Sequence, residues 1–277
     1  MHGVILKVEK VDRALLQQAA DIIRLTRHVY HPEQSVPEGW KMQSVSSPAA
    51  MKKTGFFAAF YERENPATGE TKYVIAFRGT DGISDLGSDL KIGFGQVPEQ
   101  YSQALAFVEQ VCKEKGIAPA EIELTGHSLG GYLARTAGET LGAKKVWTFN
   151  SPGPTRRERD YLARLIPGTS LPNNKLIQVR STYDVVGEWG YDEGIILEVK
   201  TDGNAHSDAS LQRGIETALG KPETPVREGL SLSSIFNAVS EKISQSQILR
   251  LAIKKLFYYG LPSMGQPKTS FLPANRL

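Results

Sequence analysis

Apolar residues recur along the chain at two spacings, one typical of strands and the other typical of helices. Strand-length apolar runs lie at 55–61, 73–77, 122–125, 145–149, 176–180 and 195–199. Helical spacing is found at 12–25, 98–115 and 129–141, and a short helix is expected near 156–165. From residue 122 onward strands alternate with helical segments, which favours crossover units and a mostly parallel sheet flanked by helices.

The first two apolar runs, 55–61 and 73–77, form an exception to this alternation. The segment from Asn65 to Glu70 between them contains Pro66 and Gly69 and has the composition of a turn. Two strand-like runs joined by such a turn predict an antiparallel hairpin.

Composition indicates a globular domain and excludes several classes of protein. The chain has 277 residues, of which 40% are hydrophobic and 23% are charged, as in ordinary folded proteins. Its one cysteine, Cys112, excludes an internal disulfide and a cysteine-based zinc cluster. Apolar runs are too short to cross a bilayer, and the N-terminus lacks a signal-peptide pattern. The expectation is a cytoplasmic protein, or one exported without a signal peptide.

Charge is distributed unevenly between the two ends of the chain. The net charge is +3, yet residues 242–277 contain six basic residues and no acidic ones, so the rest of the chain carries −3. We expect a catalytic domain over 1–220 and a helical C-terminal extension over 221–277. In that extension, 235–257 has the pattern of a basic amphipathic helix, which either contacts an anionic membrane or packs on its own domain. No motif for nucleic-acid binding accompanies this charge.

The motif that carries the most chemistry is Gly126-His127-Ser128-Leu129-Gly130, which fits G-x-S-x-G. It follows an apolar strand and begins a helix, which is the strand–turn–helix context of a strained nucleophile turn. The glycines allow strand and helix to approach closely, and Ser128 would present its hydroxyl. Leu129 would offer a backbone N–H to an oxyanion at the helix N-terminus. The alternative is an inert serine in a glycine-rich turn.

With this motif, four segments in order resemble the class 3 (fungal-type) lipase family. They are Ala76–Thr80 with 83–90, Gly126–Gly131, Thr148–Gly153 and Ser181–Val186. The resemblance covers about half of the chain. It implies an α/β-hydrolase fold and ester hydrolysis through a Ser–Asp–His triad.

By position in this family, Ser128 is implied to be the nucleophile, Asp184 the acid and His206 the base. The residue order agrees, because α/β-hydrolase triads run Ser, Asp or Glu, His along the chain. Of the five histidines, His206 alone follows Ser128. The acid is less constrained, and its competitors are Asp160, Glu188, Asp192 and Asp202.

The resemblance also implies that Thr80 supplies a second oxyanion donor. The following segment differs from the family, because Leu86 replaces the usual tryptophan. Ile83, Leu86 and Leu90 would form an apolar stripe on a small amphipathic lid over an acyl pocket. The spacing of Asp81, Asp85 and Asp89 does not match a calcium-binding loop.

The predicted function is hydrolysis of carboxylic esters, in lipids or small molecules, by a serine nucleophile and a covalent acyl-enzyme. The expected partner is a lipid or small ester substrate, and a membrane surface is a second candidate if 235–257 does not pack on its own domain. No metal or organic cofactor and no nucleic acid is expected. Two alternatives stay open: a leaderless bacterial phospholipase toxin neutralised by a protein partner, and a non-catalytic binding module on the same fold.

Overall fold

The fold is built on one eight-stranded sheet with the strand order β1-β8-β7-β6-β5-β4-β3-β2. A computed structural model of the chain describes residues 4–7, 13–79, 97–155, 171–190 and 192–220. The strands are β1 Val4–Lys7, β2 Lys41–Val45, β3 Ala58–Glu64, β4 Thr71–Phe77, β5 Ile122–His127, β6 Lys145–Phe149, β7 Leu176–Ser181 and β8 Ile195–Val199. Strands β1, β8, β7, β6, β5 and β4 pair with their neighbours in parallel. At the other edge, β3 pairs antiparallel with both β4 and β2.

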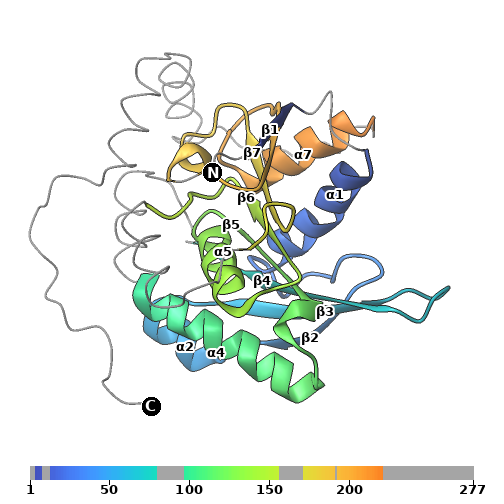
Figure 1. The fold of residues 1–277 in the computed structure, drawn as a ribbon, viewed down its shortest axis with the longest axis vertical. Coiled ribbons are helices and arrows are strands. Elements are labelled where there is room, and N and C mark those ends of the chain that lie inside the picture. Colours follow the sequence, from blue (N-terminus) through green and yellow to red (C-terminus); the bar gives the residue numbers. More distant parts are fainter. Residues whose placement is uncertain (1–3, 8–12, 80–96, 156–170, 191, 221–277) are drawn as a thin grey trace, which may run out of the picture.

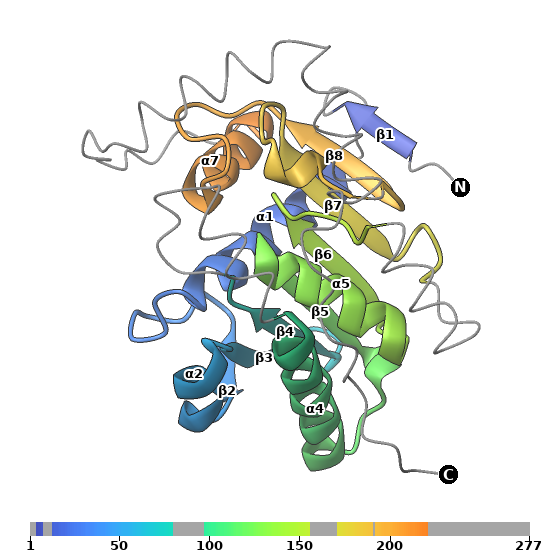
Figure 2. The same cartoon turned by 90° about the vertical axis from the view of Figure 1, so that its left-hand side faces the viewer.

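Helices cover both faces of this sheet, as Figures 1 and 2 show. Helices α1 and α7 lie side by side on one face, and α4 and α5 pack together on the other. The helices are α1 Arg13–His28, α2 Pro48–Thr54, α4 Val97–Lys115, α5 Leu129–Leu141 and α7 Asp208–Ala218, with short 3-10 turns at Pro119–Glu121 and Val186–Glu188.

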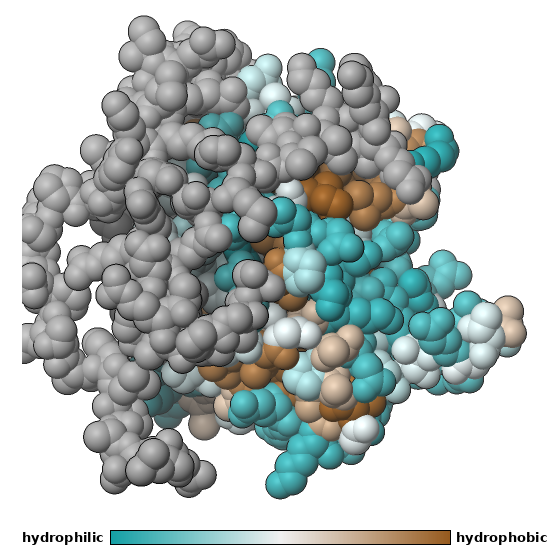
Figure 3. All heavy atoms as spheres, in the orientation of Figure 1, coloured by the Kyte–Doolittle hydropathy of each residue, from teal (hydrophilic) through white to brown (hydrophobic). Residues whose placement is uncertain are grey.

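Side chains that alternate along the central strands divide between two hydrophobic cores. On β3, Ala59 and Tyr61 pack in the core under α1 and α7, whereas Ala58 and Phe60 pack in the core under α4 and α5. This division follows from the two-residue period of a strand whose faces are both covered. Most of the coloured surface in Figure 3 is hydrophilic, with smaller hydrophobic areas between.

The predicted alternation of strands and helices is confirmed. The hairpin forms between β3 and β4, where Ala58 pairs with Phe77 and Glu64 with Thr71. The predicted helices correspond to α1, α4 and α5. Four strands and helices were not predicted, namely β1, β2, α2 and α7. The short helix expected near 156–165 and the C-terminal extension, 221–277, lie outside the described residues.

The register of the sheet brings together the loops that follow its parallel strands. Phe77 pairs with Gly126, and His127 pairs with Phe149, so β4, β5 and β6 end at one level. Ser181 and Val199 likewise pair at the ends of β7 and β8. Because the carboxyl ends of parallel strands share one edge, residues that follow them can form a single site.

Candidate active site

Ser128 stands in the turn between β5 and α5 with a strained backbone. Its φ is 55° and its ψ is −127°, and its N–H donates to the carbonyl of Phe149 at 3.0 Å. A positive φ is uncommon for a residue with a Cβ atom and marks a constrained position. The turn thereby places the Ser128 side chain between the end of β5 and the start of α5, as the G-x-S-x-G motif predicts.

The glycines of this turn are required by close packing. A Cβ on Gly130 would lie 2.2 Å from the carbonyl oxygen of Phe77, and a Cβ on Gly131 would lie 2.6 Å from the Cβ of Ser151. Neither contact is possible for real atoms. The first turn of α5 therefore packs directly on the ends of its neighbouring strands.

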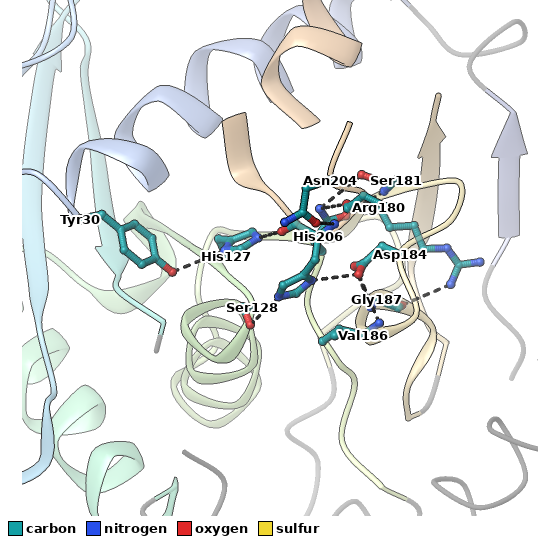
Figure 4. Close-up of polar contacts among 12 residues, drawn as sticks. Tyr30, His127, Ser128, Arg180, Ser181, Asp184, Val186, Gly187, Asn204 and His206 are labelled. Carbon is teal, nitrogen blue, oxygen red and sulfur yellow. Dashed lines mark hydrogen bonds and ion pairs between the residues drawn. The ribbon is translucent and has the colours of Figure 1, made fainter. Parts of the chain in front are cut away.

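The structure brings Ser128, His206 and Asp184 together in one hydrogen-bonded row (Figure 4). His206 Nε2 lies 3.0 Å from Ser128 Oγ, and His206 Nδ1 lies 2.9 Å from Asp184 Oδ1. Because an ionised carboxylate can only accept, the neutral imidazole carries its proton on Nδ1. Nε2 then has a free lone pair directed at the serine hydroxyl.

The Asp184 carboxylate is held by the backbone that follows it. Its Oδ1 accepts from the Val186 N–H at 3.2 Å, and its Oδ2 accepts from the Gly187 N–H at 2.8 Å. Arg180 Nη1 donates to the Gly187 carbonyl at 3.4 Å, which ties this turn to β7. These bonds orient the carboxylate toward His206.

The other acids considered from the sequence lie elsewhere. Asp192 forms an ion pair with Arg180, and Asp202 forms one with Arg213. Glu188 ends the 3-10 turn that follows Asp184. Asp160 lies outside the described residues.

His206 is positioned by a turn and by a neighbouring strand end. Its N–H donates to Asn204 Oδ1 at 2.9 Å. Asn150 Nδ2 donates to the carbonyl of Ala205 at 2.8 Å. Sequence patterns did not single out either asparagine. Asn150 has a φ of 44°, and asparagine tolerates this left-handed conformation better than most residues.

A match to a protein-family model identifies the family. The model of the phospholipase-like, Tle-like phospholipase domain matches residues 21–223. This range begins within α1, runs past the end of α7 and contains all three residues of the hydrogen-bonded row.

The chain belongs to the Tle-like phospholipase domain family.

One curated relative of this Tle-like phospholipase domain is the "Extracellular phospholipase A1" of Serratia liquefaciens. It is 36% identical over 100 residues, which are 36% of this chain and 28% of that protein. The match thus spans under a third of the relative's length. The narrower resemblance to class 3 lipases stays a prediction.

Solved structures to which the chain has a weak similarity include a lipase and a carboxylesterase. The extracellular lipase LipA of Serratia marcescens has a TM-score of 0.34 at 17% identity, covering 57% of this chain and 29% of its own. The metagenomic carboxylesterase EstE1 also scores 0.34 at 13% identity, covering 78% and 99%. The parallel strands, the flanking helices and the strand–Ser128–helix turn give the Tle-like phospholipase domain an α/β-hydrolase fold, as predicted.

The hydrogen-bonded row of the Tle-like phospholipase domain is shielded from water. The exposed fractions of Ser128, Asp184 and His206 are 0%, 2% and 7%. Shielding strengthens electrostatic interactions inside a site, because fewer water dipoles screen them. Within the described part of the chain, no group of three or more His, Cys, Asp or Glu side chains is placed to hold a metal ion.

The remaining predicted site residues have different outcomes. Leu129 lies in the first turn of α5, where no carbonyl of the helix can accept its N–H. Thr80, Ile83, Leu86 and Leu90 lie outside the described residues, and so does the segment 235–257. Among the described residues, no helix is both long and apolar enough to span a membrane.

Proposed function

We propose that this Tle-like phospholipase domain hydrolyses carboxylic ester bonds of lipids, with Ser128 as nucleophile, His206 as general base and Asp184 as the orienting acid. Ser128 Oγ attacks the ester carbonyl while His206 Nε2 takes the hydroxyl proton. His206 returns that proton to the leaving alcohol, and an acyl-enzyme remains on Ser128. Water, deprotonated by His206, then releases the fatty acid and restores the serine.

The observation that carries this proposal is the continuous row from Ser128 through His206 to Asp184. Both separations, 3.0 Å and 2.9 Å, fall within the range needed for proton transfer. Asp184 stabilises the imidazolium that forms when His206 takes the serine proton. The two backbone N–H groups on its carboxylate keep Asp184 oriented toward His206.

The negative charge that develops on the carbonyl oxygen needs hydrogen-bond donors in place beforehand. We assign one donor to the Leu129 N–H, at the positive end of the α5 dipole. As the second donor we propose the backbone N–H of Thr80, which lies outside the described residues. It follows Gly79, two residues after the end of β4. Gly79 lies against the elbow, since a Cβ on it would be 2.6 Å from the carbonyl oxygen of His127.

For the substrate we propose a phospholipid. This choice is supported by the family to which the chain belongs and by the relative named as a phospholipase A1. The three residues of the row are shielded from water. Such a site suits a lipid acyl chain, because the chain is not exposed to water when it moves there from the membrane. Hydrolysis of short esters by the same residues is expected to be slower per active site, because less remote binding energy is available.

A defined substrate panel tests this proposal. Purified protein is incubated with a phosphatidylcholine whose two acyl chains differ, with a triglyceride and with a short p-nitrophenyl ester, and the products are identified by mass spectrometry. We expect one fatty acid and the matching lysophospholipid from wild type. Ser128→Ala should release neither, whereas Ser35→Ala, at an exposed serine, should behave as wild type.

The outcome also separates the alternatives. Full hydrolysis by Ser128→Ala would overturn the proposed nucleophile, and hydrolysis of the short ester alone would overturn the proposed substrate. A non-catalytic binding module predicts no product from any of the three. The toxin role and its protein partner stay predictions.

A further inference from the structure

His127 is a buried imidazole beside the nucleophile that the proposed reaction does not use. Its Nε2 lies 2.7 Å from the carbonyl oxygen of His206, and its Nδ1 lies 3.4 Å from Tyr30 Oη. The two histidine rings are 4.9 Å apart between centroids. Figure 4 shows Tyr30, His127 and His206 as a second row that meets the first at His206.

The direction of each hydrogen bond in this second row follows from its ends. The His206 carbonyl oxygen can only accept, so His127 Nε2 carries the proton and donates. His127 Nδ1 then has a lone pair and accepts from the Tyr30 hydroxyl. The Tyr30 oxygen in turn accepts from the Gly79 N–H at 2.9 Å. This arrangement requires a neutral His127.

The surroundings of His127 favour that neutral form. Burial and the neighbouring His206 lower the pKa of His127 to about 4. The opposite effects of Asp208, of the hydrogen bond to the His206 carbonyl and of Asp184 are weaker. A proton on His206 during turnover would raise the cost of protonating His127 further. His127 therefore keeps one tautomer through the catalytic cycle.

The row joins two parts of the site that are distant in sequence. Tyr30 follows α1, Gly79 follows β4 and leads to Thr80, and His206 lies in the loop after β8. Gly79 is held against Tyr30 so closely that a Cβ on Gly79 would be 2.7 Å from the Tyr30 hydroxyl. Gly79 therefore has to be a glycine for the contact to exist.

We propose that Tyr30 and His127 are positioning residues. Together they fix the position of the general base His206 relative to Gly79, the residue that precedes the proposed second oxyanion donor. This inference rests on the proposed function of the two ends. His127 acts on His206 through the carbonyl group of that residue, and Tyr30 acts on Gly79, the residue before the proposed second oxyanion donor. Neither residue exchanges a proton with substrate.

Two substitutions at His127 separate the two ends of the row. In His127→Gln, the amide nitrogen replaces Nε2 and keeps the donor to His206, but the acceptor for Tyr30 is lost. In His127→Asn, the amide oxygen replaces Nδ1 and keeps the acceptor, but the donor to His206 is lost. Tyr30→Phe removes the hydroxyl that binds both His127 and Gly79. His31→Gln, whose side chain is 64% exposed, is the matched control.

Two readouts follow the two ends. The first is the proton resonance of His206 Nδ1, which reports the hydrogen bond to Asp184. We expect it to move in His127→Asn and to stay in place in His127→Gln, Tyr30→Phe and His31→Gln. The second is the inhibition constant of an alkyl boronic acid, which mimics the oxyanion. We expect this constant to rise about tenfold in Tyr30→Phe and His127→Gln, because the loss of one hydrogen bond weakens binding by that factor. The rise should be smaller in His127→Asn.

This crossed pattern distinguishes positioning from a general structural role. A structural role alone would move both readouts together in every variant, in proportion to lost stability, and that result would overturn the inference. So would wild-type nitrogen shifts that place the His127 proton on Nδ1. If wild type neither binds the boronic acid nor hydrolyses an ester, the proposed function fails, while the His206 resonance still decides whether His127 positions that residue.

Discussion

Gly126 and Gly130 lie so close that a Cβ atom on Gly126 would be 2.2 Å from the carbonyl carbon of Gly130. Strand β5 and helix α5 thus touch through their backbones on either side of Ser128. This contact turns the chain sharply enough to present Ser128 at the end of the sheet. The consequence is that the geometry of the site depends on two residues that take no part in the chemistry.

We therefore expect Gly126→Ala to lower the free energy of unfolding by about 3 kcal/mol or more, because neither backbone can retreat. Urea unfolding followed by circular dichroism measures this. Gly142→Ala is the control, since Gly142 has a φ of +70° and nothing within 4 Å of an added Cβ. That substitution should cost only about 1 kcal/mol, from backbone strain. Equal effects would contradict the close-packing account.

Ser128 itself stores backbone strain. At a φ of 55°, a glycine is tolerated better than a residue with a Cβ atom. The free energy of unfolding should thus be about 1 kcal/mol higher for Ser128→Gly than for Ser128→Ala. Both variants lose the hydroxyl and should lose all activity. In an unstrained position glycine is the less stable of the two, so the reverse order in thermal and urea unfolding would show that the elbow is relaxed.

Asp184→Asn tests the acid of the row without changing its size. The amide loses the charge that stabilises the His206 imidazolium, and its NH₂ group cannot accept from the groups that now donate to the carboxylate. We expect kcat to fall by about 10³- to 10⁴-fold with KM little changed. Asp192→Asn, at an acid that pairs with Arg180 instead, should keep kcat within about tenfold. Similar losses in both variants would reject the assignment.

The pH dependence of stability should reveal His127. In the unfolded chain a histidine titrates near its ordinary pKa of about 6.5, whereas the folded pKa is lowered to about 4. Between these values the unfolded state binds the proton more readily, so stability is fully present above about pH 6.5 and is lost as pH falls toward 4. The loss from this group reaches about 3 kcal/mol.

The matched comparison is His127→Gln, which does not titrate there. Urea unfolding at pH 7 and pH 4.5 should show a larger drop in unfolding free energy for wild type than for His127→Gln. Other acidic groups titrate in both proteins and cancel in this difference. Equal drops would mean that His127 is protonated in the folded state.

The sequence predicted the elements whose patterns are local. Strands β3 to β8 were recognised by their apolar runs, and helix α5 by the helical spacing of its apolar residues. The strand–turn–helix context placed Ser128 in the turn between β5 and α5, where the structure has it. Strand β2 was missed because only Met42 and Val45 in it are apolar. Helix α7 was missed although Ser207 caps it, accepting from the Ser210 N–H, a signal that a search for N-cap residues would have found.

Contacts between segments far apart in the chain could not be predicted from the sequence. Tyr30 and His127 are 97 residues apart, and no local pattern connects the end of α1 with the elbow. Asn150 gave no signal either, because its role depends on the carbonyl of Ala205 across the sheet edge. Residue order and the small number of histidines pointed to Ser128 and His206, and their side chains lie 3.0 Å apart. Their catalytic roles stay a proposal.

The central claim, that Ser128 is the nucleophile of a lipid esterase, is tested most directly by labelling with a long-chain p-nitrophenyl phosphonate. Peptide mass mapping after the reaction locates the adduct. The account predicts one adduct per chain, on Ser128, in step with the loss of phospholipid hydrolysis, and none in Ser128→Ala. An adduct on another residue, or none in a preparation that hydrolyses phospholipid, would contradict it.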